Sequence, residues 1–114
     1  MSRHDPKVRL LHMRDYAQDA MAMVEGETRA DLDTDNKLRL ALTRLVELVG
    51  EAASCLPEEL RAKHPEIPWP EVIGMRNRLI HGYDFVDYDI LWNTITRNLP
   101  QLIETLDRIL DAET

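Results

Sequence analysis

The fold is decided by residues 34–54, TDNKLRLALTRLVELVGEAAS, which are predicted to form one long helix that begins near Thr34 or Asp35. Apolar side chains recur there at spacings of three and four, the period of one helix face: Leu38, Leu42, Leu45, Val46, Val49, Ala52 and Ala53. Further apolar side chains lie outside this stripe, at Leu40, Ala41 and Leu48. A helix that is apolar on more than one side needs more than one neighbour. Packing within the chain and packing against a second copy both satisfy that need. The mostly small residues at 50–53 would allow a helix of either kind to approach closely.

A second helical pattern precedes this stretch. It is predicted to start at Asp5 and Pro6, an acceptor side chain followed by proline at the first helical position. Gly26 is its predicted stop, because glycine accepts the backbone conformation that ends a helix. Residues 27–34 are polar and predict a loop.

Two more helical patterns follow. A short helix is predicted after Pro57, and a longer one is predicted to end at His81, where Gly82 can terminate it. The last helix is predicted to begin near Asp87. Pro100 inside it should remove one backbone hydrogen bond and bend the helix.

The composition is that of one globular domain over residues 1–114, and no alternating strand pattern is present. The predicted fold class is therefore all-α, a bundle of four to five helices. No apolar run approaches the roughly 20 residues that cross a bilayer, and the N-terminus does not resemble a secretory signal. Cys55 is the only cysteine, so it is predicted to be a small buried hydrophobe in a protein of the reducing cytoplasm.

The charge balance limits the possible partners. Lys and Arg total 14 against 21 Asp and Glu, a net charge of −7, which argues against diffuse, charge-driven binding to nucleic acid. Of the 14 basic residues, 11 are arginines. Arginine forms directed, two-point contacts with phosphate, so a local cationic site stays compatible with the acidic total.

One segment carries the side chains of a possible active site. Residues 76–83, RNRLIHGY, place Arg76, Asn77, His81 and Tyr83 close together in the sequence. Arginine can hold a phosphate and histidine can move a proton near neutral pH. On a continuous helix Arg76 would lie on the apolar face, where a guanidinium needs an anionic or hydrogen-bonding partner.

A purely structural role for these residues stays open. Arg76 could pair with Glu47 or Glu51 of the preceding long helix, and a histidine near a helix C-terminus is favoured by the helix dipole. No metal site and no cofactor is predicted, because the histidines have no paired ligand spacing and the thiol stands alone.

Several motifs closely resemble the HepT-type toxins, which are HEPN-domain proteins encoded with a small nucleotidyltransferase antitoxin. The resemblance covers nearly the whole chain and is weakest in the first 30 residues. It rests on Ile67-Pro68-Trp69, Gly74-Met75-Arg76-Asn77, His81-Gly82-Tyr83, the stretch 87–92, Leu99-Pro100, Leu40-Ala41-Leu42 and Gly50-Glu51-Ala52-Ala53.

The resemblance implies an all-helical homodimer with metal-independent endoribonuclease activity against tRNA or mRNA, the toxin of a type VII toxin–antitoxin system. It implies that Arg76 and His81 are catalytic and that Asn77 supports them. It also implies that the antitoxin neutralises the toxin by transferring AMP from ATP to Tyr83. Asp84 stands where many relatives would be expected to carry an aromatic residue.

Two alternatives to the nuclease remain. In the first, the chain is a non-catalytic module that binds a nucleotide or a partner nucleotidyltransferase through Arg76 and His81, a reading that the net acidity favours. In the second, it is a purely structural dimer, which would leave Arg76 unexplained.

Overall fold

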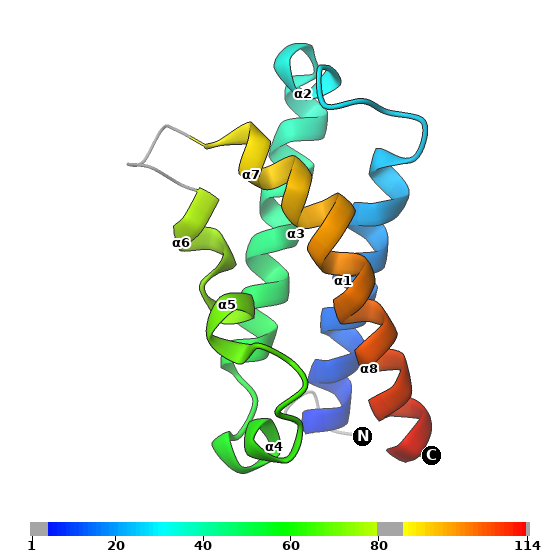
Figure 1. The fold of residues 1–114 in the computed structure, drawn as a ribbon, viewed down its shortest axis with the longest axis vertical. Helices are drawn as coiled ribbons and strands as arrows, with labels where there is room; N and C mark the ends of the chain where they lie inside the picture. The colour runs from blue at the N-terminus through cyan, green and yellow to red at the C-terminus, as the bar shows by residue number, and fades with distance from the viewer. Residues whose placement is uncertain (1–4, 80–85, 114) are drawn as a thin grey trace.

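The computed structural model describes residues 5–79 and 86–113, and these residues are almost entirely helical (Figure 1). The longest elements are α1 (Pro6–Val24), α3 (Asn36–Ser54) and a run made of α7 (Tyr88–Asn93), η1 (Thr94–Asn98) and α8 (Leu99–Glu113). Helix α1 packs against both α3 and α8. The start of α1 and the end of α8 lie at the same end of the bundle, and α2 (Asp31–Thr34) lies at the opposite end. The all-α fold class is confirmed.

Three short helices connect α3 to α7: α4 (Glu58–Lys63), α5 (Trp69–Ile73) and α6 (Met75–Leu79). Both α5 and α6 pack against α3. At Gly50 the backbones of α3 and α5 approach closely. A Cβ added to Gly50 would lie 3.1 Å from the carbonyl oxygen of Val72 and 3.2 Å from that of Ile73. The small residue at position 50 therefore serves a contact within the chain.

Aspartate side chains begin the three long segments as predicted. Asp5 accepts a hydrogen bond from the backbone N–H of Lys7 at 2.8 Å, ahead of Pro6. Asp35 and Asp87 do the same for α3 and α7, at 3.0 and 3.1 Å. Each carboxylate satisfies one of the amide groups that a helix N-terminus leaves without an internal partner.

The core gathers the apolar faces of these helices. Among the residues with no exposed surface are Met13, Leu32, Leu42, Val46, Leu79, Leu91, Ile95 and Leu106. The proline-rich connection is anchored to this core by Trp69, whose indole N–H is within hydrogen-bonding distance of the carbonyl oxygens of Arg61 and His64, at 2.9 and 3.0 Å. This anchor fixes where α5 begins.

The predicted polar loop at 27–34 is wrong in its second half, where α2 forms. The backbone N–H of Thr28 donates to the Asp31 carboxylate at 2.6 Å, and its hydroxyl lies 3.2 Å from the same oxygen. These bonds organise the turn that starts α2, and Leu32 is fully buried inside it. One buried leucine among polar neighbours gives no periodic signal, which is why the pattern missed the helix.

The single helix predicted to run to His81 is also interrupted. It divides at Gly74, whose N–H closes α5 by donating to the carbonyl oxygen of Pro70 at 2.9 Å. A Cβ at Gly74 would lie 3.0 Å from that same oxygen. Helix α6 starts after this point, and its Met75 and Leu79 are buried in the core. The predicted end at His81 lies outside the described residues.

Two other predictions have clear outcomes. The disruption expected at Pro100 is present as the π-helical turn η1, in which the N–H of Leu99 bonds to the carbonyl oxygen of Thr94. Proline has no N–H and its ring crowds the preceding turn, and the wider turn accommodates both. The prediction of a buried Cys55 is wrong, since the residue follows the end of α3 and is exposed. Within residues 5–79 and 86–113, no helix is both long and apolar enough to span a membrane.

Candidate functional site

Arg76 lies on α6, and its side chain points away from the core. The side chain is 54% exposed, and its Nε lies 3.4 Å from a carboxylate oxygen of Glu47 on α3. The expected core-facing orientation is therefore wrong, because the Arg76 side chain extends to the Glu47 carboxylate and to solvent. Pairing with Glu47, one of the two carboxylates considered from the sequence, is confirmed.

Glu47 is shared between two arginines. Arg44 on α3 lies 3.5 Å from Glu47 and 3.4 Å from Glu51, and its side chain is 57% exposed. Glu47 itself is only 20% exposed. A carboxylate at these distances from two solvated guanidinium groups holds each of them loosely, which leaves N–H donors of Arg76 available to an anion.

The other residues of the predicted site are only partly placed. Asn77 follows Arg76 on α6 and is exposed. Arg78 is exposed as well, and its Nη2 lies 3.4 Å from the carbonyl oxygen of Glu71. His81 and Tyr83 lie outside the described residues, so their roles and their distances to Arg76 stay predictions.

The described residues on either side of residues 80–85 lie next to each other. The backbone N–H of Asp87 donates to the carbonyl oxygen of Leu79 at 2.7 Å, joining the end of α6 to the residue that caps α7. This bond places the start of α7 beside the end of α6.

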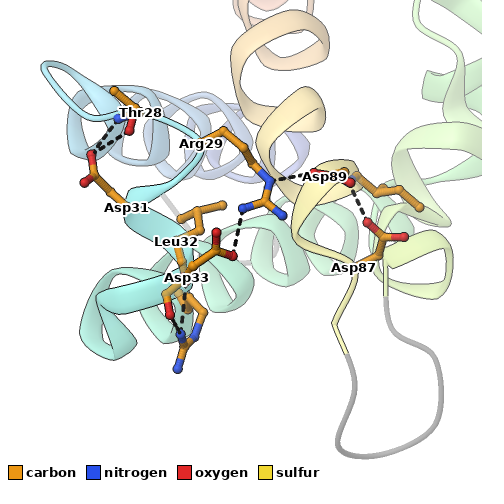
Figure 2. A network of polar contacts seen from close by, with 9 residues as sticks. Thr28, Arg29, Asp31, Leu32, Asp33, Asp87 and Asp89 are labelled. Atoms are coloured by element: carbon orange, nitrogen blue, oxygen red, sulfur yellow. Dashed lines mark hydrogen bonds and ion pairs between the residues drawn. The ribbon is translucent and has the colours of Figure 1, made fainter.

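A polar network fixes the start of α7 to the α2 end of the bundle (Figure 2). Arg29 donates from Nε to Asp89 at 2.6 Å and from Nη1 to Asp33 at 3.0 Å. Arg29 and Asp89 are 60 residues apart in the sequence. One guanidinium thus ties the turn before α2 to the first turn of α7.

Tyr88 adds an aromatic ring to this network. The guanidinium carbon of Arg39 lies 5.3 Å from the ring centroid and that of Arg29 lies 5.9 Å from it, both within the range of cation–π attraction. Arg39 also donates to the carbonyl oxygens of Leu32 and Asp33, at 3.0 and 3.1 Å. The C-terminal flank is therefore held by several directed contacts.

The charges of this network shift the titration of its members. Hydrogen bonds to Asp33 and then Asp89 raise the pKa of Arg29. The pKa of Asp31 is lowered, first by the bond from the Thr28 N–H and then by a side-chain bond with Glu27. The same bond with Asp31 raises the pKa of Glu27.

No local pattern in the sequence predicts this network. The acidic residues near the start of the last helix suggest contacts with a helix dipole, and Asp87 does cap α7. Asp89, by contrast, pairs with an arginine that no local pattern connects to it. Within the described part of the chain, no group of three or more histidine, cysteine or acidic side chains is arranged to hold a metal ion.

Comparisons with known proteins agree with the motif resemblance. Residues 13–109 match the model of the family described as "Ribonuclease HepT-like". A relative from Caldanaerobacter subterraneus, named as an RNase, is 38% identical over 108 residues, which cover 95% of this chain and 96% of the relative. A relative from Thermococcus cleftensis, named as a ribonuclease HepT, is 38% identical over 96 residues, 78% of this chain and 87% of its own.

More distant relatives cover the chain as fully. One from Methanocaldococcus jannaschii, also named as an RNase, is 30% identical over 110 residues, 96% of this chain and 91% of the relative. No solved structure matches the chain significantly. The family match extends over the long helices and over the segment that carries Arg76, and on this basis the chain belongs to the HepT-like ribonuclease family.

Proposed function

We propose that this chain is a metal-independent endoribonuclease, the toxin of a type VII toxin–antitoxin system acting on tRNA or mRNA in the cytoplasm. The observation that carries the proposal is the state of Arg76, a guanidinium 54% exposed and loosely paired at 3.4 Å with one carboxylate. It lies on α6, directly before the segment that contains His81. Membership of the HepT-like family and the names of the relatives support RNA as the substrate.

The proposed reaction is attack by an RNA 2′-hydroxyl on the adjacent phosphorus. The 2′-oxygen–phosphorus bond forms, the bond to the 5′-oxygen breaks, and the products carry a 2′,3′-cyclic phosphate and a 5′-hydroxyl. His81 takes the proton of the 2′-hydroxyl or gives one to the leaving oxygen. Arg76 stabilises the charge that gathers on the phosphate oxygens, and Asn77 supports the phosphate or the imidazole.

A homodimer would supply both an acid and a base from two copies of His81. Leu40 on α3 is 64% exposed, and a second copy on this face of the helix would remove its apolar surface from water. We expect the purified protein to sediment as a dimer and Leu40→Glu to shift it toward the monomer. A monomer at all concentrations would contradict this part of the proposal.

Control of the toxin is proposed to act on Tyr83. Transfer of AMP from ATP by a cognate nucleotidyltransferase would place a phosphate beside Arg76, occupy its donors and repel RNA. Intact-mass analysis after incubation with that enzyme and ATP should show added AMP in the unmodified sequence and none in Tyr83→Phe. AMP found elsewhere on the chain would reject the assignment.

The nuclease itself is tested with purified protein, single-stranded RNA and EDTA. Cleavage is expected, and His81→Ala should abolish it. His12→Ala is the matched control, since His12 is exposed on α1 and away from α6, and it should cut like the unmodified chain. Intact RNA, or equal cutting by His81→Ala, would contradict the proposal. The net charge of −7 favours the non-catalytic alternative, in which RNA would stay intact while a nucleotide still binds.

A further inference from the structure

A cavity lined in part by Met75 and Arg78 of α6 has no role in the proposed chemistry. Its volume is about 280 Å³, and it lies between the α5–α6 segment and the run of η1 and α8. Its apolar floor is made by four side chains that are each less than a tenth exposed: Ile67, Val72, Met75 and Leu102. The size is below that of sites for drug-sized ligands, so a single ring system fits better than a larger molecule.

The rim of this cavity is polar on two sides. Glu66, Glu71 and Arg78 stand on one side. Asn98, Gln101 and Thr105 stand on the other, at spacings of three and four that place them on one face of the last helical run.

The rim groups have unused hydrogen-bonding capacity. Among the residues that the structure describes, the side-chain amides of Asn98 and Gln101 make no hydrogen bond, and the carboxylates of Glu66 and Glu71 make no ion pair. An apolar floor with free donors on one side and free acceptors on the other matches a flat ring whose edge carries both kinds of group.

The charges select among such rings. Two carboxylates against one guanidinium disfavour a phosphate inside the cavity, whereas they favour a base with N–H donors. Guanine presents adjacent N1–H and N2–H₂ donors that one carboxylate can accept, and its O6 and N7 accept from amide N–H groups. Adenine, cytosine and uracil lack this pair of adjacent donors.

We propose that the cavity is a subsite for a guanine base of the RNA, and that it sets the sequence preference of cleavage. The inference rests on the proposed ribonuclease activity. Met75 of the cavity floor directly precedes Arg76, so their Cα atoms are about 3.8 Å apart. The two residues face different sides of a helix that is about 10 Å wide, which places the bound guanosine roughly one or two nucleotides from the cleaved bond.

Binding is tested without cleavage. The full-length chain is titrated with each of the four ribonucleosides and followed by amide chemical shifts in NMR. Guanosine is expected to shift signals around Met75, Asn98 and Gln101, and the other three should bind at least about tenfold more weakly. The double variant Glu66→Gln and Glu71→Gln should lose this difference, whereas Glu104→Gln, exposed on α8 outside the cavity, should keep it. No response to guanosine, or equal responses to all four, would overturn the proposal.

The second part of the test measures where the RNA is cut. On a pool of random RNA, the unmodified chain is expected to cut near guanosine, and the positions cut by the double variant should show no such preference. Cutting with no guanosine preference by the unmodified chain would also overturn the subsite. If no form cuts RNA, the proposed function fails, while the nucleoside titration still decides the cavity.

Discussion

The two flanks of residues 80–85 are held in opposite ways. On the N-terminal side, α6 carries Arg76, whose ion pair is long at 3.4 Å and whose partner Glu47 is shared. On the C-terminal side, α7 is tied by a 2.6 Å bond from Arg29 to Asp89, and the guanidinium carbons of Arg29 and Arg39 lie 5.9 and 5.3 Å from the ring centroid of Tyr88. The chain thus commits the arginines near α7 to its own structure, whereas Arg76 on α6 is held only by a long ion pair. The difference indicates that Arg76 can meet a ligand more readily than Arg29 or Arg39.

The largest effect is expected from the available arginine. Arg76→Ala should lower RNA cleavage by about 100- to 1000-fold, the usual loss when one donor to a transition-state oxygen is removed. Arg44→Ala is the matched control, because Arg44 is 57% exposed against 54% for Arg76 and contacts the same Glu47. It should change the rate little. Cleavage is followed on labelled RNA, with circular dichroism as the check on folding, and equal losses in both variants would remove the distinction between them.

The position of α5, on the N-terminal side of residues 80–85, is expected to depend on how closely its backbone packs against α3. Gly50→Val would push a side chain against the carbonyl oxygens of Val72 and Ile73, and should cost about 1–3 kcal/mol of the free energy of unfolding. Urea denaturation measures this cost, which should be the same at low and high salt. Lys37→Val, at an exposed position of the same helix, should cost less than about 1 kcal/mol. A Gly50→Val protein as stable as this control would show that α5 does not depend on the close approach.

The C-terminal flank should show the opposite dependence on salt. Asp89→Asn removes the charge that pairs with Arg29, and a small fall in melting temperature is expected at low salt. The difference from the unmodified chain should shrink in 1 M salt, where the screening length is about 3 Å. If the fall in melting temperature of Asp89→Asn were the same at low and high salt, packing around Tyr88, and not charge, would fix the start of α7.

The smallest effect concerns acid. A carboxyl with a folded pKa below its ordinary value of 3.8, as for Asp31, adds stability above that value and loses it as pH falls through the folded pKa. Glu27, raised from 4.5, acts in the reverse sense: its contribution is lost as pH rises through the folded pKa. Asp31→Asn removes both effects, so its stability should vary less with pH below 3.8 than that of the unmodified chain. Parallel pH profiles from thermal melts would contradict this account of the turn.

The sequence predicted what local chemistry decides. The caps at Asp5, Asp35 and Asp87 and the positive φ of 76° at Gly26 follow from rules that span a few residues. Pairings between distant segments were beyond such rules, and the bond between Arg29 and Asp89 is the clearest case.

The candidate site shows the same limit. The segment that carries Arg76 was identifiable from its residues, and pairing with Glu47 was one of two options that helix neighbours allowed. The orientation of Arg76 was wrong because a helical wheel gives only the direction in which a side chain leaves the helix, whereas the long arginine side chain carries its guanidinium outward to Glu47 and solvent. A propensity scale records only the weakness of glycine in helices, whereas the closeness of Gly74 to Pro70 depends on the assembled backbone.

The most direct test of the central claim, cleavage by 2′-hydroxyl attack beside Arg76, uses one RNA in two versions. Both are incubated with purified protein in EDTA, and one of them lacks the 2′-hydroxyl at the nucleotide that is cut. We expect the intact RNA to yield a 2′,3′-cyclic phosphate and a 5′-hydroxyl, and the 2′-deoxy version to resist at that position. Cleavage of both versions at the same bond, or a 5′-phosphate on the product, would contradict cleavage by 2′-hydroxyl attack.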